Sequence, residues 1–372
     1  MAYSLSLTKK GYIASAASLM FFLVLLALNH DRSGHQTIRA AHLDNDMLKD
    51  IGNSTLGFQK MFIISLSSRT DRRDSNTLAA ALTGLEFEFV DGVTDVSRDA
   101  LPSVDPTYKF KDGALGSWRA HMNVAQRFGY QIIALHRVNS LTNSRIVRDG
   151  LSSALVLEDD ADWDIRIKDQ RDFARASRIL KQPLRDMTDS YLDPTHPRPN
   201  AGQHPPSFAI SEEHPIRTPS ISPYGDLDRW DVLWIGHCGA RLPEEKRDTN
   251  APLGRAVISN DSTVPEPQHI NMRFGTTQLV DEYPAHTRVV SRSRDAVCTT
   301  AYAMSQIGAR RVLYEYGVHM LNHGFDNMLA AACDGSSRRL MTCLSVQPQL
   351  FQQHRAVGSQ GAFSSIDDFG DG

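Results

Sequence analysis

The sequence has no long run of Lys or Arg, no pair of cysteines at zinc-binding spacing, and no phosphate loop of the GxxxxGK[ST] or GxGxxG type. With a net charge of −3, the lack of basic runs argues against a nucleic-acid-binding surface. The missing phosphate loops disfavour a phosphotransferase or nucleotidyltransferase. The 372 residues, 41% of them hydrophobic, are enough for one large α/β domain or two smaller ones.

Cysteines are few, and all four lie late in the chain, at Cys238, Cys298, Cys333 and Cys343. In an oxidising compartment they could form two disulfides, for which three pairings exist. Buried free thiols are the alternative. The spacing alone does not choose between the pairings.

Charge is absent from residues 11–28, which are rich in Leu, Phe and Val. This segment is long enough to cross a bilayer. Because Lys9 and Lys10 precede it, the positive-inside rule predicts a cytosolic tail (1–10), a transmembrane signal anchor (11–28) and a lumenal body. A cleaved signal peptide is the alternative, but its apolar core is usually shorter and no small-x-small cleavage site follows Leu28.

Two further features agree with a single-pass type II protein of the Golgi or endoplasmic reticulum membrane. Acceptor triplets for N-glycosylation begin at Asn53 and Asn260. Residues 29–57 are polar and aperiodic, as expected of a membrane-proximal stem. We therefore expect the folded domain to span residues 58–372.

The pattern after residue 58 alternates between strands and helices, which predicts an α/β fold. The expected strands are residues 61–66, 85–90, 154–157 and 231–235, and the expected helices are residues 75–82, 115–128 and 305–317. The first two strands and their helix predict a βαβ unit. Gly317 is expected to end the last helix in a left-handed conformation.

Prolines concentrate between Pro183 and Pro223, where nine of the 17 occur. That density excludes regular helix and central strand. Because a strand pattern resumes at residues 231–235, we interpret the segment as an insertion within one domain. A linker between two domains is the alternative.

The most informative segment is the apolar run 154–157, which ends in Glu158, Asp159 and Asp160. Open α/β sheets bind ligands at the carboxyl ends of their strands. Adjacent carboxylates repel each other unless a cation shares them, and hard oxygen ligands suit Mg²⁺ or Mn²⁺. The alternative is a solvated acidic turn in which Asp160 or Asp162 caps a helix.

Several segments, in order along the chain, resemble glycosyltransferase family 25, which includes bacterial lipooligosaccharide and collagen galactosyltransferases. They are residues 63–73, 113–121, 154–160, 231–236, 301–309 and 325–326. The resemblance covers residues 60–355, with 183–223 as an insertion, and is to membrane-anchored eukaryotic members such as fungal ones. One departure is Ala120, which precedes His121 where the bacterial pattern has Ser.

The resemblance implies a GT-A-like nucleotide-diphospho-sugar transferase fold, a Rossmann-like mixed sheet flanked by helices. It also implies transfer of a sugar such as galactose, with inversion, from a UDP-sugar to a glycan, protein or lipid acceptor. A catalytically inactive lumenal member that binds sugar nucleotides or proteins is the alternative. The expected partners are the donor, the acceptor and the membrane, without nucleic acid.

The chemistry of sugar transfer assigns roles to the acids. The leaving diphosphate needs a cation, Mn²⁺ or Mg²⁺, for which Asp159 and Asp160 are the expected ligands. The acceptor hydroxyl needs a base. Asp326 matches the family's acid for this role, whereas Glu158 is expected to aid or orient the two metal-binding carboxylates. The alternative for Asp326 is an N-cap of the helix that begins at Asn327.

The residues expected to bind the donor follow the first strand or lie on the next long helix. They are Ser65, Leu66, Arg69, Arg72 and His121. For the arginines the alternative is a solvated turn, and for His121 it is a hydrogen-bonded core position. His237, directly after the strand at 231–235, is a further candidate contact to donor or metal.

Overall fold

The computed structural model describes residues 48–128, 150–180, 208–209, 222–244, 246–248, 253–271 and 274–354. They belong to one compact unit that begins at Leu48. The expected tail, the expected anchor and residues 29–47 of the expected stem lie outside the described residues. None of the helices described is long and apolar enough to span a bilayer.

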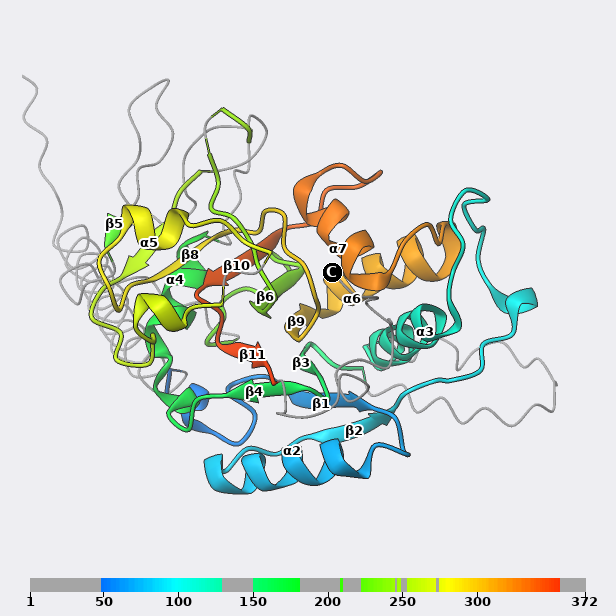
Figure 1. Ribbon diagram of the computed structural model, residues 1–372, viewed down its shortest axis with the longest axis horizontal. Coiled ribbons are helices and arrows are strands. Elements are labelled where there is room, and N and C mark those ends of the chain that lie inside the picture. Colours follow the sequence, from blue (N-terminus) through cyan, green and yellow to red (C-terminus); the bar gives the residue numbers. More distant parts are fainter. Residues whose placement is uncertain are drawn as a thin grey trace, which may run out of the picture. The chain divides into compact units, whose positions relative to one another are not determined.

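A mixed eleven-stranded sheet forms the centre of the described part (Figure 1). Its main path runs β2-β1-β3-β9-β6-β10-β8-β7-β5, and β11 pairs with β4 and β6. The strands are β1 (Lys60–Ser65), β2 (Glu88–Asp91), β3 (Ser153–Glu158), β4 (Ala161–Trp163), β5 (Phe208–Ala209), β6 (Val232–Gly236), β7 (Ala256–Ile258), β8 (Arg288–Arg292), β9 (Ala301–Ser305), β10 (Cys343–Gln347) and β11 (Phe351–Gln353).

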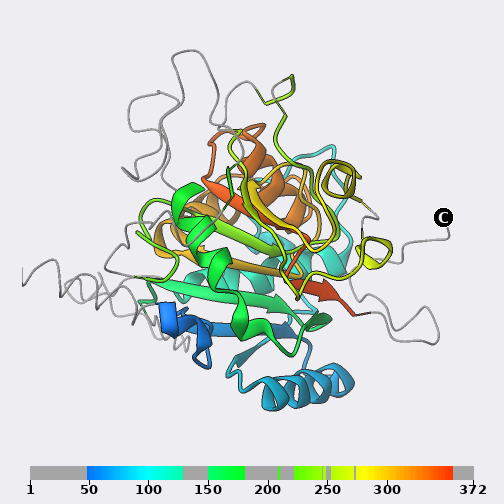
Figure 2. The ribbon, with the colours of Figure 1, turned by 90° about the vertical axis from the view of Figure 1, so that its left-hand side faces the viewer.

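The helices pack on both faces of this sheet. They are α2 (Thr70–Thr83), α3 (Asp112–Gln126), α4 (Arg171–Leu180), α5 (Gln278–Glu282), α6 (Gln306–Tyr314) and α7 (Phe325–Asp334). Figure 2 shows α4 across the near face, with α3, α6 and α7 on the far side. The predicted α/β class is therefore confirmed as a mixed sheet flanked by helices.

The core is divided by β3, whose residues from Ala154 to Leu157 are fully buried. Successive side chains of a strand point to opposite faces. Leu155 and Leu157 therefore join one apolar cluster, while Ala154 and Val156 join the other. A strand covered on both faces reads as a continuous apolar run, which is why this element was recognisable from the sequence.

Strand direction places the carboxyl ends of β1, β3, β6 and β10 together along one side of the sheet, which is called the sheet edge below. β1 is parallel to β2 and β3, and β6 is parallel to β10. β9 runs antiparallel between β3 and β6, so its first residues lie at this same edge. This arrangement brings three groups to the same sheet edge. They are the acids at the end of β3, the polar residues after β6 and the start of β9.

The predicted strands at 61–66, 154–157 and 231–235 are confirmed as β1, β3 and β6. The one predicted at 85–90 is confirmed only in its second half, because β2 begins at Glu88. The predicted βαβ unit is confirmed as β1-α2-β2, with parallel strands. The helix differs in its start, because α2 begins at Thr70 rather than near residue 75. The sequence signals for β4, β5, β7, β8, β9, β10 and β11 were not recognised.

The last predicted helix begins as expected and ends differently. Ser305 caps α6 by accepting the amide hydrogen of Gly308 at 3.1 Å. The helix does not end in a left-handed Gly317, so that prediction is wrong. Instead, Gly317 lies inside a π turn (Glu315–His319) that widens the last turn. Left-handed glycines do end two other helices, at Gly84 after α2 and Gly335 after α7.

Part of the expected stem packs into the domain. Leu48, Ile51 and Leu56 are buried in the core, and the ring of Phe58 stacks on Tyr224 with centroids 4.2 Å apart. The packed region therefore includes residues 48–57, which we expected to belong to the stem. The polar composition of this segment concealed a few apolar anchors.

The proline-rich segment is described only at 208–209 and 222–223. Residues 208–209 form β5, which pairs in parallel with β7. The segment thus contributes an edge strand to the same sheet, which favours the insertion over a linker between domains.

Both disulfides expected from an oxidising compartment are present. Cys238 pairs with Cys298, and Cys333 pairs with Cys343. The tertiary structure thereby selects one of the three pairings and excludes buried free thiols.

Gly116 provides a test of the packing of α3. A Cβ built on Gly116 would overlap the carbonyl oxygen of Val93, a backbone atom that follows β2. We expect Gly116→Ala to lower the free energy of unfolding by roughly 1–3 kcal/mol, despite the better helix propensity of Ala. Urea unfolding measures this. Gly52→Ala is the control, because its Cβ meets nothing within 4 Å; equal effects of the two changes would contradict the packing.

Candidate functional site

The candidate site lies where β1 and β3 end. Glu158 is the last residue of β3, and Asp159 and Asp160 form the turn that leads to β4. Asp326 comes from the first turn of α7, and Ser65 ends β1. These residues, far apart in the sequence, meet at the sheet edge described above.

The carboxylate of Asp159 is paired with groups of neighbouring elements. Its carboxylate forms an ion pair with Arg72 and accepts a hydrogen bond from the Ser65 hydroxyl at 2.8 Å. Asn76 donates to the Asp159 carbonyl oxygen at 2.7 Å. Ser65 and Arg72, which we expected to bind a donor, are thus brought to Asp159 and hold its carboxylate between α2 and β1.

Asp160 is the least satisfied acid of the three. It is 8% exposed, and its Oδ2 accepts from Gln353 on β11 at 2.9 Å. Its Oδ1 is buried without a hydrogen-bond partner among the described residues. Burial, reinforced by the charge of Glu158, raises the pKa of Asp160 to about 7. A buried carboxyl group in this state favours either a proton or a cation.

Glu158 is held in its ionised form. Its Oε1 accepts from the Thr299 hydroxyl at 2.7 Å and lies 3.5 Å from Nε2 of His121. Burial opposes ionisation, but the hydrogen bonds from His121 and Thr299 and the positive charge of Arg72 lower the pKa of Glu158. Glu158 therefore carries the negative charge that Asp160 meets.

His121 lies beneath this acid, at 1% exposure, and not on an open surface. Its Nδ1 is 2.8 Å from the Tyr302 hydroxyl, and its ring stacks on Phe325 with centroids 4.2 Å apart. Burial raises the pKa of Tyr302 well above its usual value, so its hydroxyl keeps a proton to donate. With Tyr302 donating to Nδ1, Nε2–H faces Glu158. The geometry is that of a positioning residue in the core.

Asp326 lies inside α7 and is not its N-cap. The helix begins at Phe325 and its N-cap is Gly324, so the capping alternative is wrong. The Asp326 carboxylate accepts the amide hydrogens of Asn327 at 2.8 Å and Cys298 at 3.3 Å. Burial raises the pKa of Asp326, and the charge of Glu158 adds to the effect. Asp326 is therefore within electrostatic reach of Glu158.

Two expected donor residues lie at the margin of the site. Arg69 is paired with Asp71 at 2.8 Å, although the charges of Asp159 and Asp160 also act on its guanidinium. Leu66 follows β1, and its backbone nitrogen lies close to Gly92 after β2. Arg73 joins the ends of the same two strands by donating to the Ser65 carbonyl at 2.8 Å.

The residues fit a metal only in part. Among the described residues, no three His, Cys, Asp or Glu side chains converge on one point. The unpartnered oxygen of Asp160 beside ionised Glu158 is nevertheless a place where a cation would relieve repulsion. Mg²⁺ commonly combines one or two protein carboxylates with substrate phosphates. The arrangement suits a cation held jointly with a ligand, not by the protein alone.

Several contributors to the site were missed from the sequence. Thr299 precedes β9, Tyr302 lies in β9, Gln353 comes from β11, and Asn76 lies on α2. Only the helical position of Asn76 was expected. The others act through pairing across the sheet, which leaves no local sequence pattern.

Comparison with known proteins adds no assignment. No protein-family model matches the chain, and no curated protein is significantly similar to it.

The raised pKa of Asp160 predicts a pH-dependent stability. Between pH 4 and 7 the folded state holds a proton on Asp160 that the unfolded chain, with a pKa near 3.8, has lost. Stability from this group is therefore present at low pH and lost as the pH rises through 7, by up to about 4 kcal/mol. Urea unfolding at pH 4.5 and pH 8 should show that the free energy of unfolding of Asp160→Asn, relative to that of wild type, is higher at pH 8 than at pH 4.5. An equal difference at both pH values would contradict the assignment.

The two disulfides should differ in their contribution to stability. Cys238–Cys298 closes a separation of 60 residues, whereas Cys333–Cys343 closes one of 10. Chain entropy predicts that replacing the first pair by Ala costs about 1.5 kcal/mol more than replacing the second. The first pair also holds the Cys298 amide at Asp326, so its loss should reduce ligand binding at this edge. Thermal unfolding compares the two double variants; equal costs would contradict the loop-length argument.

Proposed function

We propose that the chain is a glycosyltransferase of GT-A-like fold, related to glycosyltransferase family 25. It would transfer a sugar from a UDP-sugar to a hydroxyl group of a glycan, protein or lipid in the secretory lumen. The observation that carries the proposal is that Glu158, at the carboxyl end of β3, acts electrostatically on both Asp160 and Asp326, with Arg72 acting on Glu158 and Asp160.

The strand order supports a ligand site at this point. From β1 the chain passes through α2 to β2 on one side, while β3 lies on the other side of β1. Such a reversal is a topological switch point, where open α/β sheets bind ligands beyond their carboxyl ends. Ser65 and Glu158 end the two strands that flank it. Arg72, from the first turn of α2, supplies positive charge suited to a diphosphate.

Each acid has a part in the proposed reaction. Asp160 and Glu158 would hold a divalent cation together with the donor phosphates, and that cation would neutralise the charge of the leaving diphosphate. Asp159, held by Ser65, keeps Arg72 in place. Asp326 removes the proton from the acceptor hydroxyl, and its raised pKa makes it a stronger base once ionised. His121 orients Glu158 from below.

One observation favours a second candidate, a binding protein of the same fold without turnover. The carboxylate of Asp159 is already paired with Arg72, and no three-ligand metal group occurs in the described part of the chain. Such a protein would bind a nucleotide sugar and leave its glycosidic bond intact. Turnover separates the two candidates.

The test is UDP release from a panel of UDP-sugars by the full chain, in a detergent without sugar head groups, with and without Mn²⁺. We expect Asp326→Asn to lower kcat by about 10²–10⁴-fold at an unchanged KM for the donor, as for loss of a general base. Asp160→Asn should remove the response to Mn²⁺. The exposed Asp162 on β4 supplies the control, since Asp162→Asn should stay within about twofold.

Three results would count against parts of the proposal. Turnover that does not need a divalent cation would remove the metal role. Full activity of Asp326→Asn would remove the proposed base. UDP binding without turnover of any UDP-sugar would favour the binding protein.

A further inference from the structure

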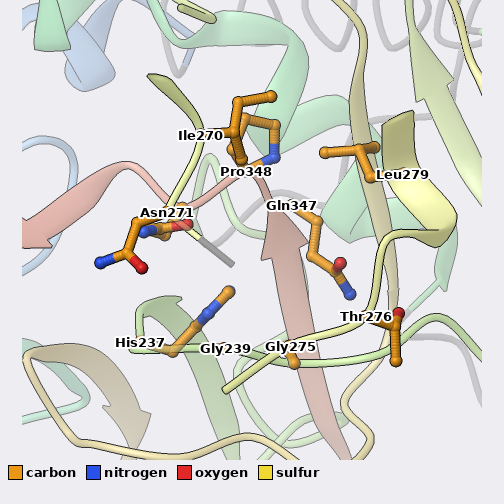
Figure 3. Close-up of a pocket in the computed structure, with 11 residues that line it drawn as sticks. His237, Gly239, Ile270, Asn271, Gly275, Thr276, Leu279, Gln347 and Pro348 are labelled. Carbon is orange, nitrogen blue, oxygen red and sulfur yellow. The ribbon is translucent and has the colours of Figure 1, made fainter. Parts of the chain in front are cut away.

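A hollow lies at the same sheet edge as the acids, beyond the ends of β6 and β10 (Figure 3). His237 directly follows β6, Gln347 is the last residue of β10, and the opposite wall is formed by Ile270, Asn271 and Leu279. Its volume is about 20 Å³, room for one water-sized group.

His237 presents a lone pair that is not used within the described chain. The residue is 4% exposed, and its Nε2 lies 2.9 Å from the Val346 carbonyl oxygen. Because a carbonyl oxygen only accepts, Nε2 carries the hydrogen and Nδ1 is an acceptor. Nδ1 is buried and has no hydrogen-bond partner among the described residues. Burial lowers the pKa of His237 to about 4, so the ring stays neutral at physiological pH.

Gln347 presents the complementary group. It is 5% exposed, and its Nε2 is also buried without a partner among the described residues. An amide nitrogen only donates. The hollow is therefore lined by one unmet acceptor and one unmet donor, each of which costs about 1–3 kcal/mol when left without a partner.

These two atoms restrict the chemistry of an occupant. A phosphate or carboxylate would bring further acceptors against the lone pair of His237, and an ammonium group has nothing with which to accept from Gln347. A hydroxyl group both donates and accepts. The nearby side chains of Ile270, Leu279 and Pro348 offer an apolar surface suited to the C–H face of a sugar ring.

The hollow is connected to the candidate site through a disulfide and a hydrogen bond. Cys238 follows His237 in the chain and is bonded to Cys298. The backbone amide of Cys298 in turn donates to Asp326 at 3.3 Å. This chain of bonds links the hollow at β6 and β10 to Asp326, whose carboxyl group also feels the charge of Glu158 at the end of β3.

We propose that this hollow is a subsite for one hydroxyl group of a neutral sugar or polyol. The hydroxyl donates to Nδ1 of His237 and accepts from Nε2 of Gln347. Resting on the proposed function, the subsite belongs to the acceptor and orients it so that another hydroxyl reaches Asp326. The donor occupies the β1 and β3 side.

The test uses neutral methyl glycosides of galactose, glucose and mannose as probes, with binding to the full chain followed by saturation-transfer NMR. At least one glycoside should bind wild type, and Gln347→Met should weaken it at least tenfold. Gln352→Met, the same change on neighbouring β11, is the matched control and should bind as wild type does. Binding of UDP, measured by calorimetry, should be the same for all three proteins.

Deoxy glycosides sharpen the assignment, because removal of the one hydroxyl that fills the hollow should abolish binding to wild type and make no further difference to Gln347→Met. Equal binding of glycosides to wild type and Gln347→Met, or no binding of any probe to wild type, would overturn the subsite and leave a water molecule as its occupant. Glycoside binding that depends on Gln347, without turnover of any UDP-sugar, would retain the subsite and reject the transferase. UDP-sugar turnover without glycoside binding that depends on Gln347 would retain the transferase and reject the subsite.

Discussion

Repulsion among the carboxyl groups at the end of β3 is the constraint around which the rest of the site is arranged. Three consecutive acids lie at the end of β3, of which Glu158 is the last residue, and each has a different set of partners. Asp159 is paired with Arg72, and Glu158 is hydrogen-bonded to Thr299 beside His121. Among the described residues, the Asp160 carboxylate accepts a hydrogen bond only from Gln353, and burial together with the charge of Glu158 raises its pKa. Of these three consecutive acids, Asp160 is therefore the one at which a proton and a cation would compete.

The antiparallel insertion of β9 between β3 and β6 joins this acid cluster to the rest of the edge. Its approach segment supplies Thr299 to Glu158 and the Cys298 amide to Asp326. The disulfide to Cys238 then anchors that segment to the end of β6. A single stretch of backbone thus contacts two of the acids and fixes the wall next to the hollow of His237, so disturbance there should affect both.

The sequence predicted the elements whose signals are local. Buried β3 and β6 show continuous apolar runs, β2 lies within an alternating segment, and α3 carries apolar residues at helical spacing. Strands β9 and β10 are equally buried but escaped recognition. The stem boundary shifted for a related reason. Leu48 and Ile51 are isolated apolar residues whose importance depends on what they pack against.

The sequence by itself determined that Glu158, Asp159 and Asp160 stand at the end of a buried strand, because burial and period are encoded within a few neighbouring residues. Through the family resemblance alone, it also indicated Asp326 as a candidate catalytic base. Only the tertiary structure decided which acid is ion-paired, which is ionised and which is left unsatisfied. Those states depend on partners brought from distant elements by strand order and direction, and electrostatic energies follow distance in space rather than separation along the chain.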